Sequence, residues 1–392
     1  MTDSRQQMTL AVHAGNGHDT LGSPFTPLYD TTTFRFDNTA SLLSVINGEK
    51  PGAFYTRYGM NPTIKSLEQR LAALDEAEAA LAFSSGMAAI SSLFLAHGGG
   101  GIICLGEIYG GTAELLQNQL TGIGVNSLFL PADDHSALEQ ALRQGASLVF
   151  FETPANPTLQ VIDIQAVAGK VHQYPAKVAV DNTFASPVNQ KPLQLGADFS
   201  VQSATKFLGG HSDLTAGVLT GSADELTKVN GWRKNLGQMI APEIAHKLKR
   251  SLITLPLRIE RHNFNTLQIA RFLQAHPSVE TVFYPGLETD PGHPLACRQM
   301  QGFGGMLSFN VKGGTVAATT VIDNLNLIAL APSLGGAETL ATQPVTTSHH
   351  GMAPEQLQQA GISGAMIRLS VGLESVDDLI NDLQQALQLI AD

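Results

Sequence analysis

One lysine, Lys206, follows small hydroxyl residues and precedes a glycine pair in the stretch QSATKFLGGHSD. Phe199 and Val201 alternate with polar residues just before it, which predicts a short strand over 199–203. The lysine would then lie where a strand leaves a sheet, the usual place for ligands in open α/β sheets. A lysine in a cleft loses its proton easily and can form a Schiff base with a carbonyl. Lys206 is therefore the first candidate for chemistry, and an ordinary surface lysine is the alternative.

Asp181 gives this lysine a chemical partner. It follows the predicted strand 177–180, which comes directly before the Lys206 strand in the sequence. Neighbouring parallel strands would bring both residues to one edge of the sheet. A lysine paired with a carboxylate that can hold a pyridinium nitrogen is typical of pyridoxal phosphate (PLP) chemistry. A simple helix cap is the alternative for a carboxylate in this place.

A phosphate group would need its own seat, and the sequence offers one. The strand predicted over 79–83 runs into Ser85, Gly86 and Met87, where a helix rich in small residues begins. Free backbone N–H groups at a helix start bind phosphate. The hydroxyl groups of Ser203 and Thr205, beside the lysine, could complete the cup. Each of these signals is weak alone, because many α/β loops look the same.

Two further residues fit the same chemistry. Tyr109 comes just after a predicted strand and could stack on a cofactor ring. Arg368, in the stretch IRLSVGLE, has the fork-shaped guanidinium that suits a substrate carboxylate. It would face the cleft if a second domain folds over the first.

The elements that must hold these residues alternate along the chain. Strands are predicted near 79–83, 102–105, 127–130, 148–151, 177–180 and 199–203, with helical segments between most of them. Repeated strand–helix units predict an α/β fold with a mostly parallel sheet and helices on both faces. A long helical stretch is predicted from 242 to roughly 274, followed by an α+β pattern with strands near 279–284, 305–311 and 365–370. The expected division is an extended arm over 1–60, an α/β domain over 61–245 and a smaller C-terminal α+β domain over 246–392.

Bulk properties narrow the class of protein. The chain has 392 residues, 43% of them hydrophobic, and a formal net charge of −11, which argues against nucleic acid or an anionic membrane as a partner. Its two cysteines, Cys104 and Cys297, do not make a disulfide framework or a metal motif. We find neither a signal peptide nor a membrane-spanning run. A cytoplasmic protein without a metal site is expected.

The motifs together resemble the Cys/Met-metabolism family of PLP enzymes, which includes cystathionine γ-synthase, cystathionine γ- and β-lyases and methionine γ-lyase. The matching segments are YTR (55–57), SSGMAA (84–89), YGGT (109–112), ETPANPT (152–158), VDNTFASP (180–187), SATKFLGGHSD (203–213), SLGGAETL (333–340) and IRLSVGLE (367–374). They reach from the arm to near the C-terminus. The resemblance implies the fold type I of PLP-dependent aminotransferases.

The resemblance also implies roles for single residues. Lys206 would hold the cofactor and then move protons, Asp181 would pair with the pyridine nitrogen, and Tyr109 would stack on the ring and act as acid or base. The residues that would bind the phosphate, besides Tyr55 and Arg57 from the arm of the adjacent subunit, are Ser85, Gly86, Met87, Ser203 and Thr205. Asn156 would lie near the phenolic oxygen, and Ser333 with Arg368 would grip the substrate carboxylate. A homotetramer built from active dimers is the implied assembly.

Four places depart from the patterns of the family. The loop after YTR has an apparent insertion near Met60. Pro332 stands where cystathionine-handling γ-enzymes carry a glutamate that meets a distal ammonium. Gly111 stands where methionine γ-lyases carry a cysteine, and Arg233-Lys234 replaces their Lys-Asp pair.

The predicted function is therefore γ-elimination or γ-replacement on an L-amino acid with a heteroatom at Cγ. A thiol, as in methionine, or an oxygen-linked group, as in canavanine, would leave. The alternatives within the family are cystathionine γ-synthase, γ-lyase and β-lyase activity. The alternative of another class is a non-catalytic binding or regulatory relative, which the presence of Lys206, Asp181 and Tyr109 disfavours.

Overall fold

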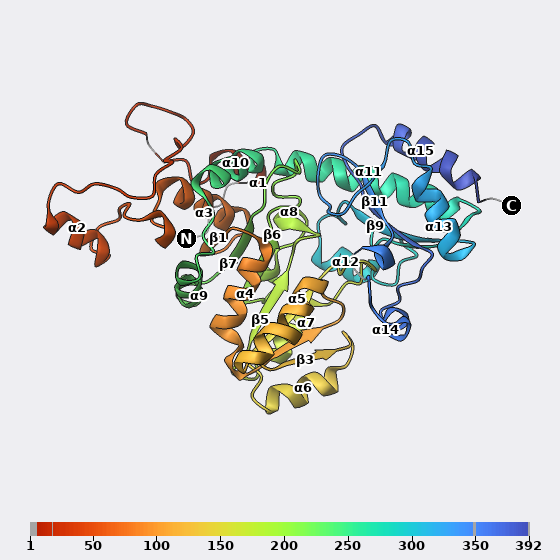
Figure 1. The fold of residues 1–392 in the computed structure, drawn as a ribbon, viewed down its shortest axis with the longest axis horizontal. Helices are drawn as coiled ribbons and strands as arrows, with labels where there is room; N and C mark the ends of the chain where they lie inside the picture. Colours follow the sequence, from red (N-terminus) through yellow and green to blue (C-terminus); the bar gives the residue numbers. More distant parts are fainter. Residues whose placement is uncertain (1–5, 18, 348–349, 391–392) are drawn as a thin grey trace.

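Two β-sheets organise the chain in the computed structural model, which describes residues 6–17, 19–347 and 350–390 (Figure 1). The larger sheet has, side by side, β1 (Ala79–Phe83), β7 (Gly217–Gly221), β6 (Phe199–Ser203), β5 (Lys177–Asp181), β4 (Leu148–Glu152), β2 (Ile102–Leu105) and β3 (Ser127–Leu130). The smaller sheet has β10 (Ala329–Leu330), β11 (Leu340–Thr342), β12 (Met366–Ser370), β9 (Met306–Val311) and β8 (Val279–Phe283).

The larger sheet is mostly parallel, as predicted. The strands from β6 to β3 run parallel to their neighbours, whereas β7 is antiparallel to both β6 and β1. β7 was not predicted from the sequence, because its five residues begin and end with glycine, a residue usually depleted in strands. Because β7 lies between β1 and β6 and is antiparallel to both, the carboxyl ends of β1 and β6 lie at the same edge of the sheet. The turn from β1 into α4 is therefore close to the residues that follow β6.

Helices cover both faces of the larger sheet. These helices are α3 (Pro62–Leu74), α4 (Gly86–His97), α5 (Gly110–Glu114), α6 (His135–Arg143), α7 (Ile164–Val171), α8 (Ser186–Asn189) and α9 (Ala223–Asn235). Alternate residues of β4 show the two faces: Phe150 packs in the core with α4, and Val149 and Phe151 pack in the core with α6 and α7. The sheet is therefore buried on both sides, which explains its apolar strands.

Helices α10 (Pro242–Leu252) and α11 (Leu255–Ala275) lead to the smaller sheet, which packs with α13 (Gly314–Asp323) and α15 (Val376–Gln388). The remaining helices there are α12 (His293–Gln299) and α14 (Pro354–Gln359). The long helical stretch predicted from 242 to roughly 274 is divided into the helices α10 and α11. Pro256 has no N–H to bond the carbonyl of Leu252, so α10 ends there and a new helix begins.

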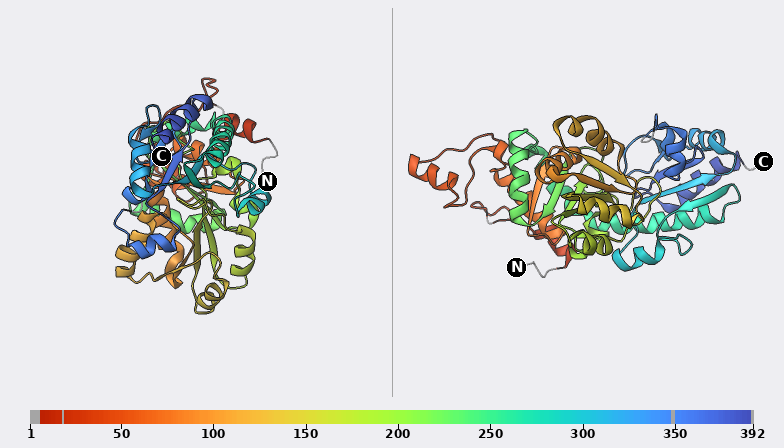
Figure 2. Two further views of the ribbon diagram at one scale, coloured as in Figure 1. Left: turned by 90° about the vertical axis from the view of Figure 1, so that its right-hand side faces the viewer. Right: turned by 90° about the horizontal axis from the view of Figure 1, so that it is seen from below.

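The N-terminal arm contains two helices, α1 (Gln7–His13) and α2 (Thr39–Ile46), where the sequence predicted an extended segment without a long helical period. α2 has no buried residue, and it projects from the rest of the molecule (Figures 1 and 2). The segment before it is held by Arg70 of α3, which donates to the carbonyls of Val12 and Ala14. The first part of the arm thus packs on its own chain, and the part around α2 does not.

The predicted domain boundaries at residues 60 and 245 stay predictions. None of the helices in the described ranges is long and apolar enough to cross a membrane.

Candidate active site

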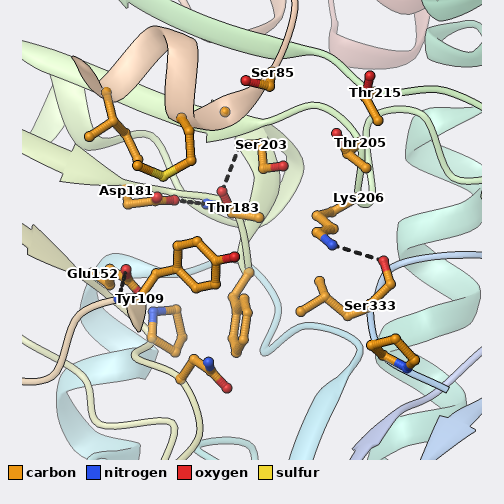
Figure 3. A pocket seen from close by; sticks show the side chains of 18 of the residues that line it. Ser85, Tyr109, Glu152, Asp181, Thr183, Ser203, Thr205, Lys206, Thr215 and Ser333 are labelled. Carbon is orange, nitrogen blue, oxygen red and sulfur yellow. Dashed lines mark hydrogen bonds between the residues drawn. The ribbon is translucent and has the colours of Figure 1, made fainter. Parts of the chain in front are cut away.

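A cavity of about 620 Å³ lies at the carboxyl ends of β4, β5 and β6 (Figure 3). Its walls also include the start of α4, the loop that contains Ser333, and Arg368 of β12. The cavity is therefore built by both sheets. The candidate residues of the sequence that line it are Ser85, Gly86, Met87, Tyr109, Asn156, Asp181, Ser203, Thr205, Lys206, Ser333 and Arg368.

Lys206 lies in the turn that follows β6, and its Nζ points into the cavity. Nζ donates a hydrogen bond to Oγ of Ser333 at 2.8 Å. Burial, together with the nearby charge of Arg368, lowers the pKa of Lys206. The amine is therefore easier to deprotonate than a surface lysine, as its proposed chemistry requires.

Asp181 ends β5 beside β6, as the sequence predicted, and is in register with Val201. Its Oδ1 accepts the backbone N–H of Thr183 at 2.9 Å. The hydroxyl of Thr183 accepts in turn the backbone N–H of Ser203 at 2.8 Å, which ties the two strand ends together. Burial raises the pKa of Asp181 to about 6. A cationic ring nitrogen against this carboxylate would lower that pKa again.

The start of α4 has the form of a phosphate seat. Ser85 is the N-cap, and its Oγ accepts the backbone N–H of Ala88 at 3.1 Å. Gly86 packs so closely on β6 that a Cβ there would lie 2.9 Å from Cβ of Ser203. The first N–H groups of a helix have no partner within it and remain free for an anion. The hydroxyl of Thr205 lines the cavity but also bonds the backbone of Ala216.

Arg368 offers a seat for a carboxylate. Its Nη1 donates to Oδ1 of Asn156 at 2.8 Å, and its Nη2 to the carbonyl of Ser333 at 3.3 Å. Nε is buried without a hydrogen-bond partner. Burial lowers the pKa of Arg368 to about 10. A buried guanidinium that bonds only neutral oxygens can gain a strong partner when a carboxylate arrives.

Tyr55 and Arg57 lie outside the residues that line this cavity. The sequence placed them on one face of an extended piece, but residues Thr56–Tyr58 form a 3₁₀ turn, η1. Arg57 donates from Nη1 to the carbonyl of Lys234 at 2.7 Å, and its guanidinium lies 4.9 Å from the centre of the Tyr58 ring. Their predicted contact with a neighbouring subunit stays a prediction.

Sequence reasoning missed Glu152, Thr183 and Thr215, which also line the cavity. The first two lie within the matched segments ETPANPT and VDNTFASP, so their place in those motifs was the available signal. Glu152 is buried, and burial first, then the charge of Asp181, raises its pKa well above the usual range for glutamate. The two carboxyl groups end neighbouring strands at the same level.

The residues present fit PLP. A helix start with a close-packed glycine, a lysine with a lowered pKa, a buried carboxyl group and a guanidinium whose Nε has no hydrogen-bond partner line one cavity. Within the described ranges, no group of three or more His, Cys, Asp or Glu residues could hold a metal ion. His349, which is next to His350 in the sequence, lies outside the described residues.

Similarity to known proteins agrees with this chemistry. L-Methionine γ-lyase of Fusobacterium nucleatum subsp. polymorphum is 42% identical over 388 residues, covering 97% of this chain and 98% of the relative. Cystathionine γ-synthase of Mycobacterium leprae is 41% identical over 384 residues, covering 97% of this chain and 96% of the relative. The crystal structure of cystathionine γ-synthase from Xanthomonas oryzae pv. oryzae, in complex with aminoacrylate and cysteine, matches with a TM-score of 0.92 and 37% identity, covering 98% of each chain.

The family itself follows from the match along nearly the whole chain. Residues 8–388 fit the sequence profile described as "Cys/Met metabolism PLP-dependent enzyme". The fold agrees, because solved γ-synthases and γ-lyases of this kind share the same arrangement, including a cystathionine γ-lyase from Lactobacillus plantarum with a TM-score of 0.91, 34% identity and coverage of 98% of this chain and 99% of that one. The chain belongs to the PLP-dependent enzymes of Cys/Met metabolism.

Proposed function

We propose that this enzyme eliminates an uncharged thiol from the γ-carbon of an L-amino acid, as a methionine γ-lyase does. One observation carries the proposal. The acidic and basic residues among the described lining of the cavity are Glu152, Asp181, Lys206 and Arg368. Our assignment uses them for the cofactor, for Tyr109 and for the substrate carboxylate, so no charge is left for a second amino-acid end. The lining adds Pro332, Leu334, Phe184 and Thr347, which suit a small uncharged group.

The residues of the cavity have separate tasks in this proposal. The start of α4, with Ser203 and Thr205, would hold the phosphate, Asp181 the ring nitrogen, and Asn156 the phenolic oxygen. Tyr109 would cover the ring, and Arg368 with Ser333 would orient the substrate carboxylate. PLP, when bound, supplies an electron sink for the negative charge that develops when substrate protons leave. The protein has to place the substrate and to move its protons.

Lys206 is the group best placed to move them. Its lowered pKa lets the amine accept a proton from the substrate and return it later. Ser333 accepts a hydrogen bond from the same Nζ and offers its carbonyl to Arg368. Binding of a carboxylate at Arg368 would therefore act on the residue that also holds Lys206.

A product assay on the purified enzyme tests the proposal. The substrates are L-methionine, L-cystathionine, L-canavanine, and an O-acylated homoserine together with cysteine. We expect 2-oxobutyrate from methionine at a higher kcat/KM than any product from cystathionine. Homoserine from canavanine would mean that an oxygen-linked group leaves. Pyruvate from cystathionine, or efficient formation of cystathionine, would contradict the proposal. Lys206→Ala should lose the absorbance of the bound cofactor and all turnover.

A gain-of-function variant tests directly whether the cavity lacks a charge for the second amino-acid end of cystathionine. Pro332→Glu places a carboxylate in the lining, where the family's cystathionine-handling γ-enzymes carry one. We expect kcat/KM for cystathionine to rise up to about fivefold relative to methionine, because a partly exposed ion pair contributes up to about 1 kcal/mol. Pro332→Gln, which matches the size without the charge, is the control. Equal ratios in both variants would show that position 332 does not set the preference.

Cystathionine γ-synthase activity is the second candidate, because a relative of that name is 41% identical. The same assay decides between the two. We further propose that the enzyme is cytoplasmic and assembles as a homotetramer made of two active dimers. The projecting arm, with α2 unburied, supports an assembly in which a neighbouring subunit covers it.

A further inference from the structure

The backbone of Tyr109 is held by a residue that lines the cavity. The N–H of Tyr109, in the loop that precedes α5, donates to Oε1 of Glu152 at the end of β4, at a distance of 2.5 Å. Tyr109 is the N-cap of α5. Its ring is half exposed and extends into the cavity on the side of Glu152 and Asp181 (Figure 3). A single buried carboxyl group thus fixes the point from which the ring starts.

The ring itself lies over Gly111. A Cβ on Gly111 would come within 2.6 Å of Cε1 of the tyrosine ring, and within 3.3 Å of Cδ1 and Cζ. Carbon atoms in contact lie about 3.5–4.0 Å apart, so the ring could not keep this position next to any other residue. The backbone of Gly111 has no positive φ, so an alanine at this position would add no backbone strain. The glycine is therefore needed for the space alone.

We infer that Glu152 and Gly111 are positioning residues that together set the place of the Tyr109 ring. Glu152 fixes the backbone by accepting the N–H, and Gly111 leaves the room that the ring fills. The inference rests on the role given to Tyr109 in the proposed function. It adds that the stacking geometry is set by two residues that need not touch the cofactor.

The groups around the Glu152 side chain affect whether its carboxyl group is charged. Burial and the charges of Asp181 and Glu107 raise its pKa, while N–H bonds from Tyr109 and Asn156 act against the rise. Cys104 faces it from β2, and its own pKa is raised by burial, so it adds no charge. These surroundings favour the uncharged form of the carboxyl group, whose oxygen still accepts the N–H of Tyr109. Glutamine, which keeps an acceptor oxygen without charge, is its closest replacement.

Gly111→Ala is the first test. We expect the added methyl to displace the ring, to change the visible circular dichroism of the bound cofactor, and to weaken PLP binding to the apoenzyme about three- to tenfold. kcat/KM should fall about tenfold or more, since small misplacements are costly. Gly122→Ala, with no atom within 4 Å of the new Cβ, is the matched control and should resemble the wild type. An unchanged dichroism and PLP affinity in Gly111→Ala would overturn the inference.

Glu152 is tested by a pair of variants. Glu152→Leu removes the acceptor and should reproduce the dichroism change and the loss of PLP affinity. Glu152→Gln should restore both to within about twofold of wild type. Glu114→Gln, which changes an exposed carboxyl group of α5, is the control and should resemble the wild type. If Glu152→Gln behaves as badly as Glu152→Leu, the backbone contact is not what Glu152 provides.

A double-mutant cycle separates positioning from a general structural effect. In a Tyr109→Ala background there is no ring to displace, so adding Gly111→Ala should change PLP affinity no further. Full additivity would overturn the inference. Tyr109→Ala alone tests the proposed role of the tyrosine. If its dichroism and PLP affinity equal those of wild type, that role and the inference fail together, whereas a change there without one in Gly111→Ala rejects the inference alone.

Discussion

At the residue scale, the active-site cavity gathers groups whose ordinary ionisation is changed by burial. Desolvation lowers the pKa of Lys206 and raises that of Asp181 to about 6. The nearby histidine His262 shows the same effect in a supporting role. Its Nδ1 lies 2.6 Å from the carbonyl of Val371, just after β12, and its ring meets that of Phe207 edge-on. It thus connects the segments that carry Lys206 and Arg368.

His262 predicts a pH dependence of stability. Burial lowers its pKa to about 4, from 6.5. Between pH 6.5 and pH 4 the histidine is therefore protonated in the unfolded chain but not in the folded one. Its contribution to the free energy of unfolding is fully present above pH 6.5 and is lost as the pH falls towards 4. The full loss is about 3 kcal/mol. We expect the melting temperature of His262→Gln, which keeps a donor for Val371, to fall less steeply between pH 7 and pH 5 than that of wild type. Parallel curves would contradict this.

At the element scale, a buried ion pair joins α3 to α9 behind the sheet. Nη1 of Arg233 lies 2.6 Å from Oε1 of Glu68, and both side chains are buried. The same nitrogen donates to the carbonyl of Ala82 in β1. Burial raises the pKa of Glu68, but the charges of Arg233 and Lys65 outweigh it and keep the pKa below its usual value. The arginine that departs from the family pattern thus has a structural partner.

Breaking this pair should be costly. Arg233→Met leaves the buried Glu68 carboxylate with only the largely exposed Lys65 as a charged partner, and we expect a loss of about 3 kcal/mol in the free energy of unfolding. The double variant Arg233→Met with Glu68→Gln should lose less than the sum of the single variants, as measured by denaturant titration. Arg143→Met, which breaks an exposed pair with Glu139, should cost under about 1 kcal/mol. Similar losses in both arginine variants would refute the argument.

At the scale of the whole molecule, the arm is the part that one chain does not explain. Arg70 and Lys249 tie its first segment to α3 and α10, through carbonyl and hydroxyl oxygens of Val12, Ala14, Gly15 and Thr26. Beyond that point α2 has no buried residue, and Tyr55 and Arg57 lie away from the cavity. These positions are explained if the arm completes the active site of a neighbouring subunit.

Hybrid enzymes test that idea. Arg57→Ala and Lys206→Ala should each lose most activity on their own. In a mixed assembly, the site that contains Lys206 on the Arg57→Ala subunit receives an intact Arg57 from the other subunit. We expect mixing after mild dissociation to restore about a quarter of the wild-type activity, because half of random dimers are hybrids with one complete site in two. No recovery, with hybrids shown by mass, would place Arg57 in its own subunit's chemistry.

Much of the fold and of the active site could be predicted from the sequence. Strand periodicity predicted the parallel strands, and Lys206 and Asp181 were placed at neighbouring strand ends because side chains at the carboxyl edge of parallel strands must meet. Local patterns were misleading where a backbone effect was decisive, as at Pro256, or where glycines concealed a strand, as in β7.

The contacts between side chains from different elements could be read only from the tertiary structure. The contact of Arg368 with Asn156 and the hydrogen bond from the Tyr109 backbone to Glu152 each join residues from different elements. Such contacts depend on how two sheets are oriented to within about an ångström. Hydrophobic periodicity sets which face of an element is buried, but not the distance between side chains that approach from different elements.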